Sequence, residues 1–261
     1  TGVVKNNLGT LIVDDSGTAN SMTKLVITGD AALTVTGALQ FAAASTPTVD
    51  ASAATGALTL DVDTDLVSTI TTGSGADSLD FGNSLASTDI VDSGAGIDTV
   101  IVDSLANAAS VTLNTTYSLT NVEKVSIEGA TGAASTGVDL SIDATQVGLT
   151  DLILVESQAE ATGTGTEAGN FTVTNLAAGV GVTLVSNKVD ATNAAQFSKI
   201  DVVSLALADA TGTTDNITVT LQGTSGSTAI ENSIMDLSVL NVETLSIVSS
   251  HALTTALTAT D

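Results

Sequence analysis

Two short stretches of the chain carry glycines and acids in the same order. Residues 72–80 read TGSGADSLD and residues 93–101 read SGAGIDTVI, so the frame Gly-x-Gly-x-Asp-x-hydrophobic occurs twice. Glycine tolerates positive φ in a tight turn, where carbonyl oxygens stay uncovered, and the Asp adds a carboxylate. Ca²⁺ binds about six to eight oxygens and no nitrogen or sulfur. The frame therefore suits a cation-binding turn, although an ordinary turn in an acidic protein stays possible.

A third acid, Asp89 in Asp89-Ile90-Val91, lies between the two copies. We expect Asp77, Asp89 and Asp98 to head three successive strands. Their spacing of twelve and then nine residues departs from a regular ladder and permits one or two calcium sites. The candidate ligands are the carboxylates and turn carbonyls of Gly73, Gly75, Asp77, Asp80, Asp89, Asp92, Gly94, Gly96 and Asp98.

The charge balance is a separate argument for a cation. The chain has 29 acids against 5 basic residues, a formal net charge of -24. Carboxylates on stacked coils about 4.8 Å apart repel by roughly 1 kcal/mol per pair in water, and by more when buried. A halophilic surface would also explain the acids, but it predicts an even spread, whereas they gather at 61–65 and 77–103.

The elements that would position these residues are short strands. The pattern hydrophobic-Thr-hydrophobic, a period-two alternation, predicts strands at 33–35, 58–60, 111–113, 171–173, 182–184 and 217–219. A second pattern, hydrophobic-x-x-hydrophobic-x-hydrophobic, begins at residues 22, 122, 149, 200 and 242. Two of these copies share the longer frame Asn-Val-Glu, at 121–123 and 241–243. These are irregular internal repeats.

The predicted fold is all-β, a parallel β-solenoid (β-helix or β-roll) of short irregular repeats, with a β-sandwich as the alternative. With four Phe, no Trp and one Pro, the chain suits a narrow coil interior better than a sandwich core. We expect residues 1–261 to form a single elongated solenoid segment of a longer protein, because the sequence begins TGVVKNN without Met or signal peptide.

The stretches TGSGADSLD and SGAGIDTVI resemble the calcium-binding nonapeptide of RTX proteins, with Thr or Ser in place of the first Gly. Together with VDASAATGALTLDV, the region 49–103 looks like the repeats of RTX-type surface-layer proteins and large adhesins of Gram-negative bacteria. The resemblance implies a secreted, extracellular, calcium-dependent β-solenoid at the bacterial cell surface, with the calcium turns at 72–103.

The expected function is therefore that of a structural surface-layer (S-layer) segment that self-associates into a lattice or homo-oligomer. A repeat module of an adhesin that binds a host, ice or biofilm surface is the alternative. A polysaccharide-active β-helix enzyme is disfavoured, because the chain lacks Arg and Trp and has one Tyr and one His, and we expect no enzymatic activity. Another region of the protein is a candidate for binding cell-surface polysaccharide.

Composition also bears on other partners. Nucleic acids and anionic membranes require clustered Lys or Arg, which this sequence lacks. No apolar run is long enough to cross a bilayer, so we expect no membrane insertion. The absence of cysteine rules out disulfides and fits many bacterial extracellular proteins.

Overall fold

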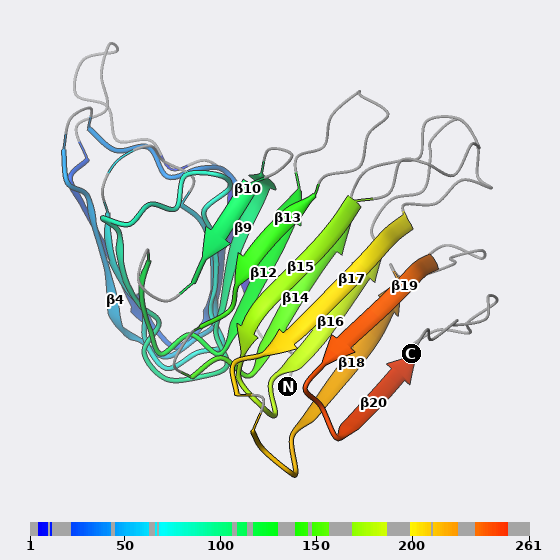
Figure 1. Ribbon diagram of the computed structural model, residues 1–261. Helices are drawn as coiled ribbons and strands as arrows, with labels where there is room; N and C mark the ends of the chain where they lie inside the picture. Colours follow the sequence, from blue (N-terminus) through cyan, green and yellow to red (C-terminus); the bar gives the residue numbers. More distant parts are fainter. Residues whose placement is uncertain are drawn as a thin grey trace. The chain divides into compact units, whose positions relative to one another are not determined.

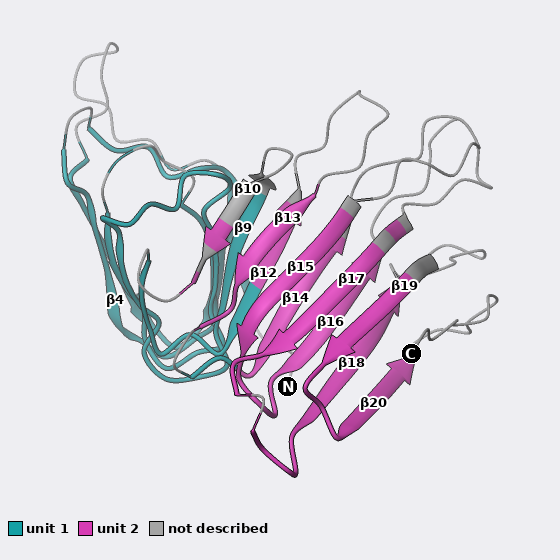
Figure 2. Cartoon of the chain, viewed as in Figure 1, with its two compact units in different colours: residues 1–103, 114–125, 147–149 teal, residues 104–113, 126–146, 150–261 magenta. Residues whose placement is uncertain are grey.

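The computed structural model describes residues 5–9, 11, 22–42, 45–62, 66, 68–105, 109–113, 117–129, 139–145, 148–156, 169–186, 199–209, 211–223 and 233–249. These residues form twenty strands and no helix, which confirms the all-β prediction (Figure 1). The part of the chain so described thus contains no helix that could span a membrane. The strands belong to two compact units, residues 1–103, 114–125 and 147–149 and residues 104–113, 126–146 and 150–261 (Figure 2).

The first unit contains two parallel sheets. One has the order β1-β3-β5-β7-β9, and the other has the order β2-β4-β6-β8-β11. The strands of the first sheet are β1 (Lys5–Leu8), β3 (Ala32–Val35), β5 (Leu58–Asp61), β7 (Ser78–Asp80) and β9 (Thr99–Leu105). Those of the second are β2 (Lys24–Gly29), β4 (Thr48–Ala54), β6 (Thr69–Thr71), β8 (Ile90–Asp92) and β11 (Ser118–Thr120).

The second unit repeats this arrangement. Its sheets have the orders β12-β14-β16-β18-β20 and β10-β13-β15-β17-β19. The strands of the former are β12 (Lys124–Gly129), β14 (Asp151–Glu156), β16 (Gly181–Ser186), β18 (Asn216–Gly223) and β20 (Thr244–Ser249). Those of the latter are β10 (Ala109–Thr112), β13 (Leu140–Asp143), β15 (Gly169–Leu176), β17 (Lys199–Leu207) and β19 (Ser233–Leu240).

From β1 to β9, and again from β12 to β20, the chain alternates between two parallel sheets. We call one strand in each sheet, with its connections, a rung. Each strand pairs in parallel with the equivalent strand of the preceding rung. In the first unit Ser78 pairs with Thr59 and Thr99 pairs with Ser78, which makes these rungs 19 and 21 residues long. Long parallel sheets of this kind are consistent with a parallel β-solenoid. They differ from a β-sandwich, whose sheets are antiparallel.

The core consists of inward-facing aliphatic side chains stacked in register. In the first unit Leu60, Leu79 and Val100 form one such column, each at most 1% exposed. In the second unit Leu152, Val182 and Val219 form another column, and all three are fully buried. The outward-facing residues between them are mainly Thr, Ser and Asp, as the period-two pattern predicted. Each predicted hydrophobic-Thr-hydrophobic segment overlaps a strand.

Candidate functional site: a buried carboxylate ladder

The acids of the two glycine-rich turns lie one above the other. Leu58, Asp77 and Asp98 occupy equivalent positions, just at the start of β5 and just before β7 and β9. The Leu58 N–H donates to Asp77 Oδ1 at 2.8 Å, and the Asp77 N–H donates to Asp98 Oδ1 at 2.7 Å. The Asp98 N–H donates in turn to Glu123 Oε2 at 3.0 Å. We call Asp77, Asp98 and Glu123 the carboxylate ladder.

The ladder accepts hydrogen bonds from backbone N–H groups at the starts of β5, β7 and β9. Asp77 is 2% exposed and Asp98 is 1% exposed, so an unpaired N–H there would be costly. Each carboxylate uses one oxygen for this bond. The other oxygens, Asp77 Oδ2 and Asp98 Oδ2, are buried and have no hydrogen-bond partner.

Burial changes the acidity of Asp98. The pKa of Asp98 is raised from 3.8 to about 6. Desolvation is the main cause and the neighbouring carboxylates of Asp77 and Glu123 add to it, while the hydrogen bond from the Asp77 N–H acts in the opposite direction. Unless something compensates the charge, ionised Asp98 therefore destabilises the first unit at neutral pH. A cation or a proton would both serve.

Asp89 lies at the entry to the other sheet of the first unit. Its Oδ1 accepts hydrogen bonds from the N–H and the hydroxyl of Ser68, at 2.7 and 3.0 Å, and its Oδ2 accepts one from the Ala86 N–H at 2.8 Å. Asp89 precedes β8 as Asp77 precedes β7 and Asp98 precedes β9, so the three acids do head three successive strands. The uneven spacing of twelve and nine residues arises because Asp89 precedes a strand of one sheet, whereas Asp77 and Asp98 precede strands of the other.

The glycines of the repeated frame permit close stacking of the turns. Gly94 and Gly96 have φ values of 76° and 152°, in the region that favours glycine. A Cβ atom on Gly94 would overlap the carbonyl oxygen of Gly73, and one on Gly96 would overlap that of Gly75. The Gly73 carbonyl also accepts the Ala95 N–H at 2.8 Å. The spacing Gly-x-Gly-x-Asp thus has a steric cause within this fold.

The remaining predicted ligands, Asp80 and Asp92, follow inward-facing residues of β7 and β8 and so face outward. Asp80 Oδ1 accepts the Gly82 N–H at 3.0 Å. Asp92 Oδ1 accepts the Gly94 N–H at 3.1 Å and the side-chain amide of Asn121 at 2.7 Å. Of the nine predicted ligands, the structure brings the carboxylates of Asp77 and Asp98 together. It places Asp80, Asp89 and Asp92 in other columns.

Sequence reasoning missed two residues of this site, Asn121 and Glu123. Asn121 has a φ of 55° and turns the chain into β12, and Glu123 then reaches back to the preceding rung. The same frame recurs as Asn241-Val242-Glu243, where Asn241 has a φ of 66° and Glu243 Oε2 accepts the Asp215 N–H at 2.8 Å. The repeat was visible in the sequence, and its signal was the shared Asn-Val-Glu.

The second unit contains a related ladder, in which the side-chain amide of Asn170 takes the place of one carboxylate. Asp139 Oδ1 accepts the Asn170 N–H at 3.0 Å, and Asn170 Oδ1 accepts the Val202 N–H at 3.1 Å, over rungs of 31 and 32 residues. These residues, with Ser141 and Thr172, line a shallow groove of about 460 Å³ on the outer face of β13, β15 and β17.

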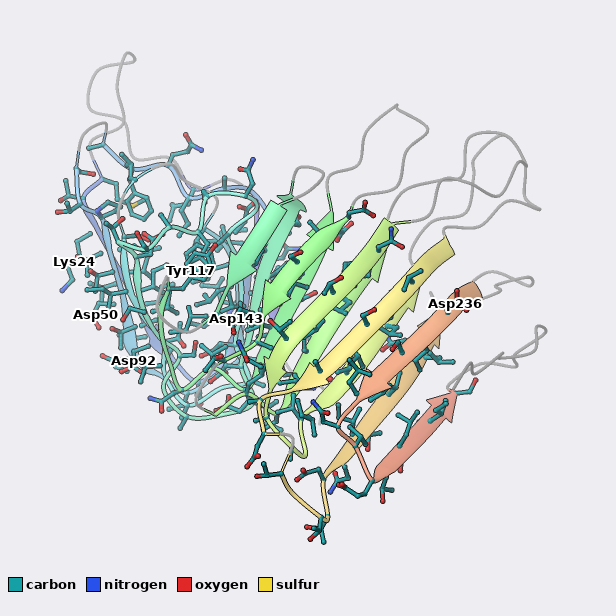
Figure 3. The ribbon with its side chains drawn as sticks, in the orientation of Figure 1. Lys24, Asp50, Asp92, Tyr117, Asp143 and Asp236 are labelled. Atoms are coloured by element: carbon teal, nitrogen blue, oxygen red, sulfur yellow. The ribbon has the colours of Figure 1, made fainter. Side chains whose placement is uncertain are left out.

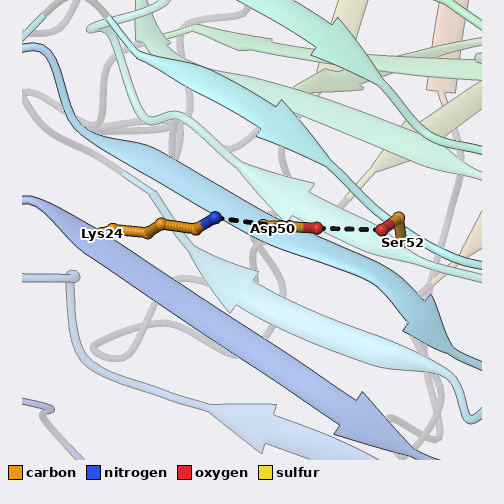
Figure 4. A network of polar contacts seen from close by, with 3 residues as sticks. All are labelled: Lys24, Asp50 and Ser52. Atoms are coloured by element: carbon orange, nitrogen blue, oxygen red, sulfur yellow. Dashed lines mark hydrogen bonds and ion pairs between the residues drawn. The ribbon is translucent and has the colours of Figure 1, made fainter.

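An acid on the first unit's surface shows the opposite electrostatic behaviour. Asp50 on β4 pairs with Lys24 Nζ on β2 at 3.1 Å and accepts the Ser52 hydroxyl at 2.9 Å (Figure 4). The Ser52 hydroxyl and the Lys24 ammonium lower the pKa of Asp50. Figure 3 shows Lys24, Asp50 and Asp92 at the surface of this unit. Asp50 is thus compensated by polar partners, whereas Asp77 Oδ2 and Asp98 Oδ2 have no hydrogen-bond partner.

The fit of a metal ion to the ladder is partial. Among the described residues, no three His, Cys, Asp or Glu side chains form a group that could hold one. The two uncompensated oxygens, Asp77 Oδ2 and Asp98 Oδ2, do suit a hard cation, which would need backbone or water oxygens to complete its shell.

Comparisons with known proteins give no assignment. No protein-family model matches the chain, and neither a curated protein nor a solved structure does. The class of protein that the fold defines is therefore an all-β chain of stacked parallel rungs.

Proposed function

We propose that this chain is a non-enzymatic structural protein of the bacterial cell surface. In this proposal it is a parallel β-solenoid segment of a secreted, RTX-like surface-layer protein that self-associates into a lattice and is stabilised by Ca²⁺. Support for the solenoid comes from the alternation of strands between two parallel sheets from β1 to β9 and from β12 to β20. Rungs that contact only their neighbours build extended surfaces by repetition, which suits a structural role.

Calcium binding rests on one observation, the two buried carboxylate oxygens at Asp77 and Asp98 that have no hydrogen-bond partner. In the proposal, Asp77 and Asp98 hold the ion, and backbone or water oxygens complete its shell. The predicted contributions of Asp80, Asp89, Asp92 and the four glycines belong to the same hypothesis of one or two calcium sites.

The calcium proposal is tested by melting the protein with Ca²⁺ and with chelator, alongside calorimetric titration. Binding to the folded state stabilises it by about 2.7 kcal/mol when calcium is a hundredfold above Kd. We expect the double variant Asp77→Asn/Asp98→Asn to lose most of this response, while Asp236→Asn, an exposed acid on β19, retains it. Identical melting with calcium and chelator, together with no binding heat, would leave the stretch 72–103 as a plain turn region.

A repeat module of a large adhesin is the second candidate, and one observation favours it. Ser141, Thr172, Ser204 and Ser238 align in register across β13, β15, β17 and β19. Each lies between inward-facing neighbours, so the four hydroxyls repeat along one outer face at the spacing of the strands, a pattern suited to an ordered polar surface.

Electron microscopy of the parent cell surface separates the two candidates. Ordered two-dimensional arrays labelled by an antibody against this chain would support the surface layer, and label on isolated projections would support the adhesin. Cleavage of an acidic polysaccharide by the purified chain would contradict both and favour an enzyme.

A further inference from the structure

Three buried oxygens without a hydrogen-bond partner belong to two neighbouring turns of the first unit. Among the described residues, the buried side-chain oxygens that lack a partner are Asp77 Oδ2, Ser93 Oγ, Asp98 Oδ2 and Asp215 Oδ2. The first three lie in the turns 72–77 and 93–98, which stack directly on each other, because the Ala95 N–H donates to the Gly73 carbonyl at 2.8 Å. The proposed calcium site uses the two carboxylates but not the Ser93 hydroxyl.

The Ser93 side chain faces the core of the first unit. It follows β8, whose alternation turns Val91 and Ser93 inward, and each of them is 1% exposed. At the other end of the same turn Asp98 also faces inward and is 1% exposed. Residues 95–97 between them are exposed. The serine hydroxyl and the carboxylate therefore flank one turn on its inner side.

The neighbouring rungs show why the Ser93 hydroxyl lacks a partner. Thr72 occupies the equivalent position one rung earlier, and its Oγ1 donates to the Ser93 carbonyl at 2.8 Å. The corresponding acceptor for Ser93 is the carbonyl of Asn121 on the next rung. Asn121 has a φ of 55°, which turns the backbone away from strand geometry, and the bond from Ser93 is not made.

The three oxygens are not bonded to one another either. A serine hydroxyl donates one hydrogen bond and a carboxylate oxygen accepts, yet no bond joins Ser93 Oγ to Asp77 Oδ2 or Asp98 Oδ2. Buried polar atoms left in this state cost free energy unless a ligand contacts them. Two carboxylates balance the charge of a divalent cation, and a hydroxyl adds a third oxygen without adding charge, which suits a hard cation in a buried site.

We propose that Ser93 Oγ is a ligand of the calcium ion that Asp77 and Asp98 hold. The inference rests on the proposed calcium site and adds a side-chain oxygen to it. Ser93 stands where the RTX nonapeptide has its first glycine, so this oxygen is one that a glycine could not supply.

Calorimetric titration of Ca²⁺ into the whole chain tests the assignment. We expect Ser93→Ala to bind calcium about tenfold or more weakly. Ser93→Thr keeps the hydroxyl and matches Thr72 of the preceding rung, so it should bind as the wild type does. The control is Ser74→Ala, at an exposed serine in the preceding turn. Equal affinity in Ser93→Ala and the wild type would overturn the inference and leave calcium binding intact, whereas a wild type that binds no calcium would refute the calcium proposal and the inference with it.

Thermal melting with and without calcium separates an ion from a buried water at Ser93. In chelator we expect Ser93→Ala to melt at or above the wild-type temperature, because it removes a buried hydroxyl without a partner. At a fixed calcium concentration it should melt below the wild type. Alanine fits the position, since Ala51 occupies it one rung before Thr72 and is fully buried. An equal loss in chelator and in calcium would show that the hydroxyl binds water rather than the ion, and would overturn the inference. Far-UV circular dichroism checks that each variant is folded.

Discussion

The variant Asp98→Asn should stabilise the calcium-free protein at neutral pH. Asp98 is 1% exposed and its folded pKa is about 6 against an ordinary value of 3.8. A raised folded pKa contributes stability that is fully present below about pH 3.8 and is lost as the pH rises through about 6. A difference of about two pKa units corresponds to about 3 kcal/mol as an upper bound.

Asparagine keeps the acceptor oxygen for the Asp77 N–H and puts an uncharged N–H₂ group in place of Asp98 Oδ2, which has no partner in the wild type. At pH 7.5 in chelator, the gain of up to about 3 kcal/mol raises the Tm by roughly 6–12 °C. At pH 4 both proteins are neutral at residue 98, and the difference should shrink toward zero.

Differential scanning calorimetry across pH 4–8 measures this dependence, and Asp236→Asn controls for the change in net charge because Asp236 is exposed. The reasoning is refuted if Asp98→Asn melts at or below the wild-type temperature at pH 7.5. It is also refuted if its advantage is the same at pH 4, since a pH-independent gain would not come from the ionised carboxylate.

Two further predictions concern the backbone of the site and are measured by urea denaturation. Gly96→Ala should lower the free energy of unfolding by about 3 kcal/mol or more, because a Cβ there meets the Gly75 carbonyl in addition to the positive φ. Gly148→Ala, with a φ of 91° and nothing within 4 Å of the added carbon, should cost only about 1 kcal/mol, and equal losses would contradict the steric argument. Asn121→Ala should cost about 1–2 kcal/mol and Asn121→Gly less, because the φ of 55° strains alanine and spares glycine; the reverse order would contradict this account.

Much of the fold could be predicted because it depends on local patterns. Segments such as 171–173 alternate hydrophobic and hydroxyl residues, and this alternation predicts which face of the strand is buried in the core. The acids at 77, 89 and 98 were correctly placed at strand entries for the same reason.

The partners of those acids could not be predicted, because they depend on which rungs stack. Asp98 meets Asp77 across 21 residues and Glu123 across 25, separations that turn length and register decide together. The sequence frame suggested carbonyl oxygens turned toward a cation, whereas the Gly73 carbonyl is engaged by the Ala95 N–H of the next turn. Nearest-neighbour patterns carry no information about such contacts. That residues 1–261 form a single elongated segment of a longer protein stays a prediction.

The return of each rung to an equivalent position has a consequence for how such a gene changes length. Thr71 and Asp92 are partners in adjacent strands of one sheet, 21 residues apart. A chain that passed directly from Thr71 to Ser93 would keep every remaining strand in its own sheet, and Asp98 would meet the Leu58 N–H that Asp77 now caps. A deletion of half that length would instead bring the next strand into the wrong sheet. We therefore expect recombination between equivalent positions of two rungs to preserve the fold at a different length, and recombination within a rung to disrupt it.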